Sequence, residues 1–278
     1  MKRFLARIRS DRTLPAIAIA LALIVFNQLL FLTPIYRVIG GDTVLTINAI
    51  VNISAALAGI WLGFRLWRSA QRGESLRAIW GSLTTGLILW LAGEMLWDIY
   101  QYLRGIQMPT SSPADIAWML GYIAIIAGVW LRIRSLRMRL TKPWQYAVLA
   151  GFAVAVILAV LYIILPILYE THIDISYNRY IGLFYGICDL ALGFLALLLM
   201  LLLEGGLLSK PWAVIAAACF CVAVSNLLYA YTLSHGIYQL APAAGLDLLS
   251  YLVDTCYTLA YILMTLGLYL QARLLDAI

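Results

Sequence analysis

The chain has 278 residues, of which 64% are hydrophobic and only 12% are charged. Soluble domains are roughly 45 to 50% apolar and about 25% charged, so this composition excludes a water-soluble globular protein. The formal net charge of +6 comes from basic residues in short clusters between apolar runs. Such clusters are typical of charges that set membrane topology. We therefore expect membrane lipids, and no nucleic acid, around this protein.

Apolar runs of about twenty residues recur along the whole chain, and each is long enough to cross about 30 Å of hydrocarbon. Chain breakers separate them: the first run stops before Pro34, and the fourth begins at Pro113 after the capping serines Ser111 and Ser112. The predicted spans cover residues 14–32, 43–67, 79–102, 113–133, 144–169, 180–203, 211–234 and 246–270. The predicted fold class is therefore all-α, a polytopic transmembrane helical bundle of eight helices.

Arginine and lysine are concentrated on one side of these predicted spans. They cluster at the N-terminus, after the second span and after the fourth, whereas the alternate loops hold only Arg37, Arg104 and Arg179. Basic residues accumulate on the cytoplasmic side of membrane proteins. This bias predicts that both the N and the C terminus are cytoplasmic.

The fourth and eighth spans align without a gap. Residues 115–122, DIAWMLGY, match residues 254–261, DTCYTLAY, and the match continues at Gly128 with Gly267. A weaker alignment of the third and seventh spans places Glu94 on Asn226. The sequence thus predicts two tandem four-helix repeats, 1–142 and 143–278, which are parallel because each contains an even number of crossings. The alternative is a coincidence between two aromatic-rich helices.

Carboxylates within the spans are the first candidates for function, because insertion of a central Asp costs about 2.5 to 3.5 kcal/mol. Glu94 and Asp98 lie one helical turn apart in the third span, whereas Asp189 and Asp254 lie in the sixth and eighth. Asp115 opens the fourth span, where the helix dipole favours a negative charge. In the predicted orientation all of these acids fall in the outer half of the bilayer.

Aromatic residues accompany the acids in this layer. Tyr122 and Tyr261 lie about two turns inside their spans, where each hydroxyl needs a buried partner, most simply a carboxylate. The layer is either a hydrogen-bond network that orients the helices or a pocket for a small ligand, where aromatic faces and acids would suit a cation. The candidate ligand-binding residues are Glu94, Trp97, Asp98, Asp115, Trp118, Tyr122, Asp189, Asn226, Asp254, Tyr257 and Tyr261.

The sequence lacks the residues that several kinds of chemistry require. The only lysines, Lys2, Lys142 and Lys210, lie outside the spans, which excludes a retinal Schiff base. The histidines, His172 and His235, fall in predicted outer loops, so no span holds a His pair for haem or zinc. No phosphate-binding loop, nucleophile elbow or HExxH pattern occurs. We expect no catalytic or metal-ligating residues and no enzymatic activity, and the sequence names no cofactor.

The third and fourth spans also carry a family resemblance. Residues 94–100, EMLWDIY, a short loop with Pro109 and Asp115, and then Trp118 and Tyr122 resemble the polytopic sensor region of some bacterial and archaeal signalling proteins. In those proteins a similar region precedes a histidine kinase or a cyclic-di-GMP synthase or hydrolase. The resemblance implies an input module in the cell membrane. No output module follows Ile278 in this sequence, so we expect either that it is a piece of a longer protein or that it signals through a partner protein.

These observations predict a sensory or ligand-binding membrane module with an acidic and aromatic site. Two other functions fit the same residues. Parallel repeats with intramembrane acids suit a small proton-coupled secondary transporter. The lack of an output module also fits an accessory subunit of a larger membrane complex.

Overall fold

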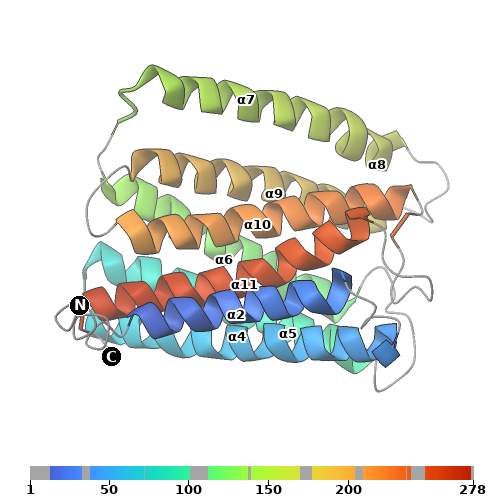
Figure 1. Cartoon of the computed structure of the whole chain (residues 1–278). Coiled ribbons are helices and arrows are strands. Elements are labelled where there is room, and N and C mark those ends of the chain that lie inside the picture. The colour runs from blue at the N-terminus through green and yellow to red at the C-terminus, as the bar shows by residue number, and fades with distance from the viewer. Residues whose placement is uncertain are drawn as a thin grey trace, which may run out of the picture.

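The computed structural model describes residues 13–32, 38–71, 73–100, 112–136, 139–169, 177–203, 209–235, 237–238 and 248–276. Its helices form a single bundle (Figure 1). They are α2 (Thr13–Leu32), α4 (Gly41–Ser69), α5 (Ser75–Asp98), α6 (Pro113–Leu136), α7 (Pro143–Ala159), α8 (Leu165–Tyr169), α9 (Tyr177–Leu202), α10 (Ser209–Ser234) and α11 (Leu248–Leu274). In this described part of the chain, eight helical stretches are long and apolar enough to cross a membrane. The predicted all-α, multi-pass membrane protein is confirmed.

The fifth span differs from the uniform helix that the sequence predicts. Between α7 and α8 the backbone forms a π-helical turn, η2 (Val160–Ile164). Pro166 follows two residues later; it has no N–H to donate, and its ring crowds the carbonyl of Tyr162. A widened turn accommodates that crowding without ending the helix. Elsewhere the observed bounds differ from the predicted ones by a few residues, because polar residues next to the apolar runs continue the helices.

The two ends of the bundle differ in charge. We call the end where α2 begins and α11 ends the basic end, which lies at the left in Figure 1. Its described cations are Arg65, Arg68, Arg77, Arg132, Arg134, Arg139, Lys142, Lys210 and Arg273. We call the opposite end the acidic end; there the described part of the chain contributes Arg179 as a cation, together with the carboxylates of Asp98 and Asp115.

Six helices make the centre of the bundle, and α2 and the span formed by α7 and α8 lie at its periphery. The most extensive packing joins α5 to α6 and α10 to α11, and α4 and α9 then contact α5 and α10 respectively. Contacts of α4 with α11 and of α6 with α9 close the centre. Helix α7 lies along one edge (Figure 1), and its described buried residue is Gln145, whose Nε2 donates to the Leu201 carbonyl at 2.8 Å.

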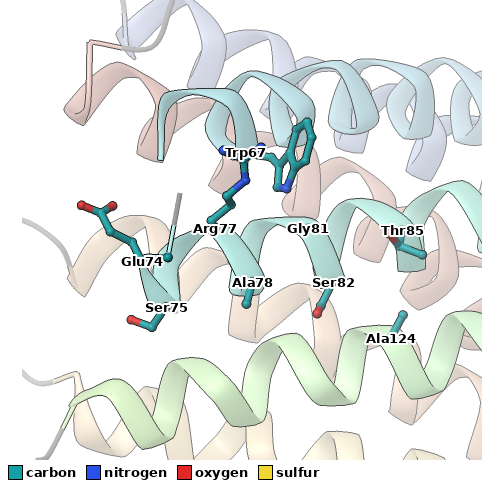
Figure 2. Close-up of a pocket in the computed structure, with 10 residues that line it drawn as sticks. Trp67, Glu74, Ser75, Arg77, Ala78, Gly81, Ser82, Thr85 and Ala124 are labelled. Carbon is teal, nitrogen blue, oxygen red and sulfur yellow. The ribbon is translucent and has the colours of Figure 1, made fainter. Parts of the chain in front are cut away.

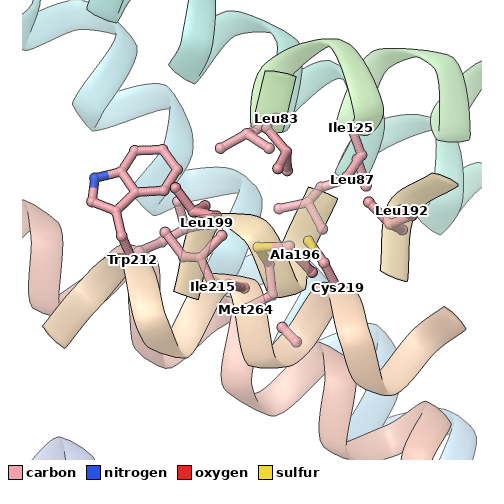
Figure 3. Close-up of a cluster of buried hydrophobic side chains, with 14 of the residues drawn as sticks. Leu83, Leu87, Ile125, Leu192, Ala196, Leu199, Trp212, Ile215, Cys219 and Met264 are labelled. Atoms are coloured by element: carbon pink, nitrogen blue, oxygen red, sulfur yellow. The ribbon is translucent and has the colours of Figure 1, made fainter. Parts of the chain in front are cut away.

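The apolar core occupies the part of the bundle nearer the basic end. Figure 3 shows side chains of α5, α6, α9, α10 and α11 meeting there. Trp80 and Trp212 are both about 1% exposed, and their rings stack with centroids 4.8 Å apart. Since lipid tails are as apolar as these side chains, close dispersion contact rather than removal from water holds the core together.

Candidate functional site

Tyr122 is the centre of a buried polar cluster that joins three helices. Its hydroxyl on α6 donates to Asp189 Oδ1 on α9 and accepts from Asn226 Nδ2 on α10. Asn226 Nδ2 also lies 3.4 Å from the same Asp189 oxygen. Tyr122 and Asp189 are only 2% and 1% exposed. The predicted carboxylate partner of Tyr122 is therefore confirmed, and we call these three residues the Tyr122 cluster.

Asp115 extends this cluster but also caps its own helix. Its Oδ2 accepts from the Ser112 backbone N–H at 2.8 Å and from the Ser112 hydroxyl at 3.0 Å, so it satisfies the N–H of the residue that precedes α6. The other oxygen, Oδ1, accepts from the Tyr185 hydroxyl at 3.0 Å. The Tyr185 ring in turn packs edge-on against Tyr122, with centroids 5.9 Å apart.

A second group, which we call the Glu94 cluster, joins α5 to α11 and α4. The Tyr257 hydroxyl donates to Glu94 Oε2 at 2.7 Å, and the Tyr261 hydroxyl lies 3.4 Å from that of Tyr257. Asn52 lies close enough to Glu94 for a side-chain hydrogen bond, and Asp98 lies within electrostatic range of Glu94. Tyr261 therefore reaches a carboxylate through Tyr257, not directly as the sequence suggested.

The Glu94 cluster contains oxygen acceptors without donors. Asn52 is 3% exposed, yet its Oδ1 has no hydrogen-bond partner, and neither does Asp98 Oδ2. Leaving a buried acceptor unpaired costs roughly 1 to 3 kcal/mol. Within the described part of the chain, no three His, Cys, Asp or Glu side chains gather to hold a metal ion. The unpaired oxygens of Asn52 and Asp98 thus distinguish this cluster within the described part of the chain.

An amide and hydroxyl network lies beside this cluster and joins α2 to the bundle. Asn48 Oδ1 accepts from Asn27 Nδ2 at 2.9 Å and from the Thr258 hydroxyl at 2.6 Å. All three side chains are buried. The two asparagines can be recognised from the sequence as polar residues within predicted spans. The role of Thr258 as their partner cannot be predicted, because threonine is common in apolar helices.

The hydrogen-bond partner of Asp254 in the described structure belongs to neither cluster. Its Oδ1 accepts from the Tyr238 hydroxyl at 3.1 Å, and its Oδ2 has no hydrogen-bond partner. Tyr229 packs edge-on against Tyr238 and lies within electrostatic range of both Asp254 and Asp115. Tyr238 lies just beyond the end of α10, where no periodic pattern marks it as a partner, so sequence reasoning missed it.

The two predicted tryptophans pack together at the acidic end. The rings of Trp97 and Trp118 are tilted, with centroids 5.9 Å apart. Trp118 also covers Gly93, because a Cβ added there would lie 2.8 Å from its Cε2 atom. Its indole Nε1 is buried without a hydrogen-bond partner. These rings form an aromatic surface between α5 and α6, next to the helix that carries Glu94.

Both clusters combine side chains from the two predicted halves. Tyr122 of the first half contacts Asp189 and Asn226 of the second, whereas Glu94 of the first half contacts Tyr257 of the second. A pocket that the structure describes lies elsewhere, at the basic end. It therefore remains a prediction that all of the candidate ligand-binding residues share one cavity.

Two polar clusters make up the candidate site. Its described features are a saturated Tyr122 cluster and an acceptor-rich Glu94 cluster, both within membrane-spanning helices. No protein-family model, no curated protein and no solved structure matches this chain.

Proposed function

We propose that this chain is a non-enzymatic sensory module of a bacterial or archaeal cell membrane that binds a small organic cation at the Glu94 cluster. The observation that carries the proposal is that this cluster joins the two halves and has unpaired acceptors. Glu94 and Asn52 come from residues 1–142, and Tyr257 and Tyr261 come from residues 143–278. A molecule bound there contacts both halves at once.

The chemistry of the cluster favours a protonated amine. An ammonium group has several N–H donors, which would satisfy Asn52 Oδ1 and Asp98 Oδ2. Its charge would be balanced by Glu94, and the faces of Tyr257 and Tyr261 would add cation–π attraction of about 0.5 to 2 kcal/mol. Tyr122 and Asn226 both donate to Asp189 Oδ1, and no oxygen of the Tyr122 cluster is among the buried unpaired acceptors of the described residues.

The binding would signal by favouring one arrangement of the halves. A ligand shifts such an equilibrium only as far as its affinities for the two arrangements differ. Residues from both halves contact the proposed ligand, so a shift of α11 against α5 changes that affinity directly. The change would pass to a partner protein.

We also propose that the halves are tandem parallel copies. An offset of 132 residues places Trp80 on Trp212, and these two rings stack against each other. The same offset places Leu83 on Ile215. A Cβ added at Gly128 would meet Leu83, and one added at the aligned Gly267 would meet Ile215. The contacts of α6 with α9 and of α4 with α11 correspond in the same way.

The charge difference between the two ends of the bundle also favours one orientation in the membrane. We propose that the basic end faces the cytoplasm, because cationic residues accumulate on that side of membrane proteins. The acidic end, with Glu94 four residues from the end of α5, then lies toward the outside. Ligand would reach the site from the external face.

The transporter alternative requires a polar path to the basic end. The apolar core of Figure 3 lies between the polar layer and that end, with Leu87 deeper in α5 than Glu94 and Ile125 deeper in α6 than Tyr122. This packing favours a binding module. The accessory-subunit alternative is distinguished by stoichiometric partners that copurify.

A calorimetric titration tests the proposed ligand class. Wild-type protein in nanodiscs is titrated with methylammonium, tetramethylammonium and sodium ions. We expect methylammonium to bind most tightly, because tetramethylammonium has no N–H to donate and sodium offers neither a donor nor an apolar group. Glu94→Gln keeps the size of the side chain but removes its charge, so we expect binding to weaken about thirtyfold, since loss of a buried charge partner costs roughly 2 kcal/mol or more.

The matched control is Glu74→Gln at the basic end, where the side chain is exposed. This variant should bind as the wild type does. Binding of all three probes unchanged in Glu94→Gln, or no binding to the wild type, would contradict the proposal. Uptake of a bound probe into proteoliposomes, driven by a proton gradient, would establish the transporter instead.

A further inference from the structure

A groove of about 670 Å³ opens on the side of the bundle at the basic end (Figure 2). It lies between the end of α4, the first part of α5 and the middle of α6. Its lining residues are mostly small: Trp67, Gly73, Glu74, Ser75, Arg77, Ala78, Gly81, Ser82, Thr85 and Ala124. Ala78 and Ser82 point from α5 toward α6, and Ala124 points back toward them (Figure 2).

Trp67 and Arg77 form the wall of the groove at its mouth. The Trp67 ring lies against Gly81, because a Cβ added there would be 3.2 Å from Trp67 Cδ1. The Arg77 guanidinium lies 4.3 Å from the centroid of the Trp67 ring, and its Nη1 donates to the Ala70 carbonyl at 3.4 Å. The cation is thus held at the edge of the groove by the backbone and by an aromatic face.

Two more arginines on α4 are also stacked on rings, although neither is among the lining residues of the groove. Arg68 lies 5.0 Å from the Phe64 ring centroid, and Arg65 lies 5.6 Å from that of Trp61. The carboxylate among the lining residues is Glu74. A guanidinium stacked on a ring keeps its N–H edge for a phosphate, which it recognises with paired hydrogen bonds. Arg77 therefore gives the mouth a cation for a phosphate, and the Glu74 carboxylate also lines the groove.

The length of the groove along α5 matches the thickness of one leaflet of a bilayer. From Glu74 to Thr85 it follows α5 for about 16 Å, at roughly 1.5 Å per residue. Half of a hydrocarbon core of about 30 Å is about 15 Å. An acyl chain whose headgroup lies at the interface has this length, whereas a transmembrane helix of a partner would pack across both leaflets.

We propose that the groove binds one anionic phospholipid from the leaflet at the basic end. Its phosphate lies at Arg77, and one acyl chain lies along Ala78, Ser82 and Ala124. The small side chains leave the volume that the chain fills, and the surrounding bilayer supplies the lipid. This site is separate from the Glu94 cluster and does not depend on the ligand proposed there.

Native mass spectrometry of the whole detergent-solubilised protein tests this site. Protein is titrated with phosphatidylglycerol or with phosphatidylcholine, and the wild type should retain one phosphatidylglycerol at concentrations where phosphatidylcholine dissociates. We expect Arg77→Gln to weaken this binding about tenfold. Ser82→Leu should weaken it equally, because a larger side chain fills the groove while every charge remains.

Two matched controls separate the groove from the general charge of the basic end. Arg134→Gln removes an exposed arginine of α6 outside the groove, and Ala150→Leu enlarges an exposed position on α7. Both should bind phosphatidylglycerol as the wild type does. The proposal is overturned if Arg134→Gln is as harmful as Arg77→Gln, or if Ser82→Leu binds normally. It is also overturned if Ser82→Leu alters only the oligomeric state, which would identify a helix-packing surface.

Discussion

The acids of the polar layer differ in how fully the protein satisfies them. Asp189 receives donors from Tyr122 and Asn226, and Asp115 receives them from Ser112 and Tyr185. Asp98 Oδ2 and Asp254 Oδ2 are instead unpaired. Because an unsatisfied buried oxygen raises the free energy of the empty protein, a ligand with matching donors gains most at the unpaired groups. A saturated group stabilises the bundle instead.

Replacement of Tyr122 by Phe tests this structural role. The variant removes the hydroxyl that donates to Asp189 and accepts from Asn226, and it leaves the ring in place. We expect a loss of about 1 to 2 kcal/mol in the free energy of unfolding, near the upper range for interhelical hydrogen bonds in membranes. Reversible unfolding in mixed micelles measures the loss.

The control is Tyr162→Phe on the peripheral η2 turn, where the side chain is 60% exposed. This variant should change the free energy of unfolding by less than about 0.5 kcal/mol. Equal effects of the two substitutions would show that the Tyr122 hydroxyl contributes nothing specific.

Glycines decide how closely the paired helices pack. A Cβ added at Gly121 on α6 would lie 3.2 Å from the Gly86 carbonyl on α5. At Gly267 on α11 it would lie 3.0 Å from the Pro211 carbonyl on α10. Backbones at this distance exclude larger side chains, and close approach is what drives helix association in a lipid environment. The pairs α5 with α6 and α10 with α11 are thus the rigid elements of the bundle.

Leucine at Gly128 or at Gly267 should separate these pairs. Each added side chain meets both a side chain and backbone of the facing helix, Leu83 in one case and Ile215 in the other. We expect each variant to lose about 3 kcal/mol or more, the upper range for overpacking, and the two losses to agree within roughly 1 kcal/mol. The same unfolding assay applies.

Gly151→Leu on α7 provides the control, because a Cβ added at Gly151 meets nothing within 4 Å. Its stability should stay close to that of the wild type. A Gly267→Leu protein as stable as Gly151→Leu, beside an unstable Gly128→Leu, would refute the equivalence of the two helix pairs.

At the scale of the whole molecule, polar and apolar contacts between the halves lie at different depths. The stacked pair of Trp80 and Trp212 joins them near the basic end, and the two polar clusters join them near the acidic end. Core packing resists sliding, because a change of register would open cavities. Motion triggered by a ligand is therefore expected as a tilt at the acidic end about a fixed core.

Labelling of engineered cysteines in intact cells tests the orientation of the molecule. A membrane-impermeant maleimide should modify His235→Cys at the acidic end but reach Glu74→Cys at the basic end only after the cells are permeabilised. Both positions are exposed. The native cysteines are buried or half-buried within spans, so the wild type should give little background. The reverse labelling pattern would invert the proposed topology.

Local properties of the sequence predict much of the fold. Hydropathy and chain breakers are sufficient for the eight spans, because the bilayer sets the length that an apolar helix must have. The carboxylate partner of Tyr122 also follows from a local rule and is confirmed. At the start of α6 the acceptor is the Asp115 carboxylate and not the predicted serine hydroxyl, and Ser111 lies outside the described residues. The π-helical turn before Pro166 does not follow from a local rule, since a helix can accommodate a proline in a membrane with several geometries.

Only the tertiary structure decides which polar residues meet. Apolar residues surround most of these helices on every side, so the sequence does not specify which face of a span lies inward or beside which neighbour. Packing of α4, α5 and α11 places Glu94 with Tyr257 and Asn52, and it leaves Asp254 with Tyr238. The acids are visible from the sequence because charge in a membrane is costly, whereas their partners depend on the rotation and register of packed helices.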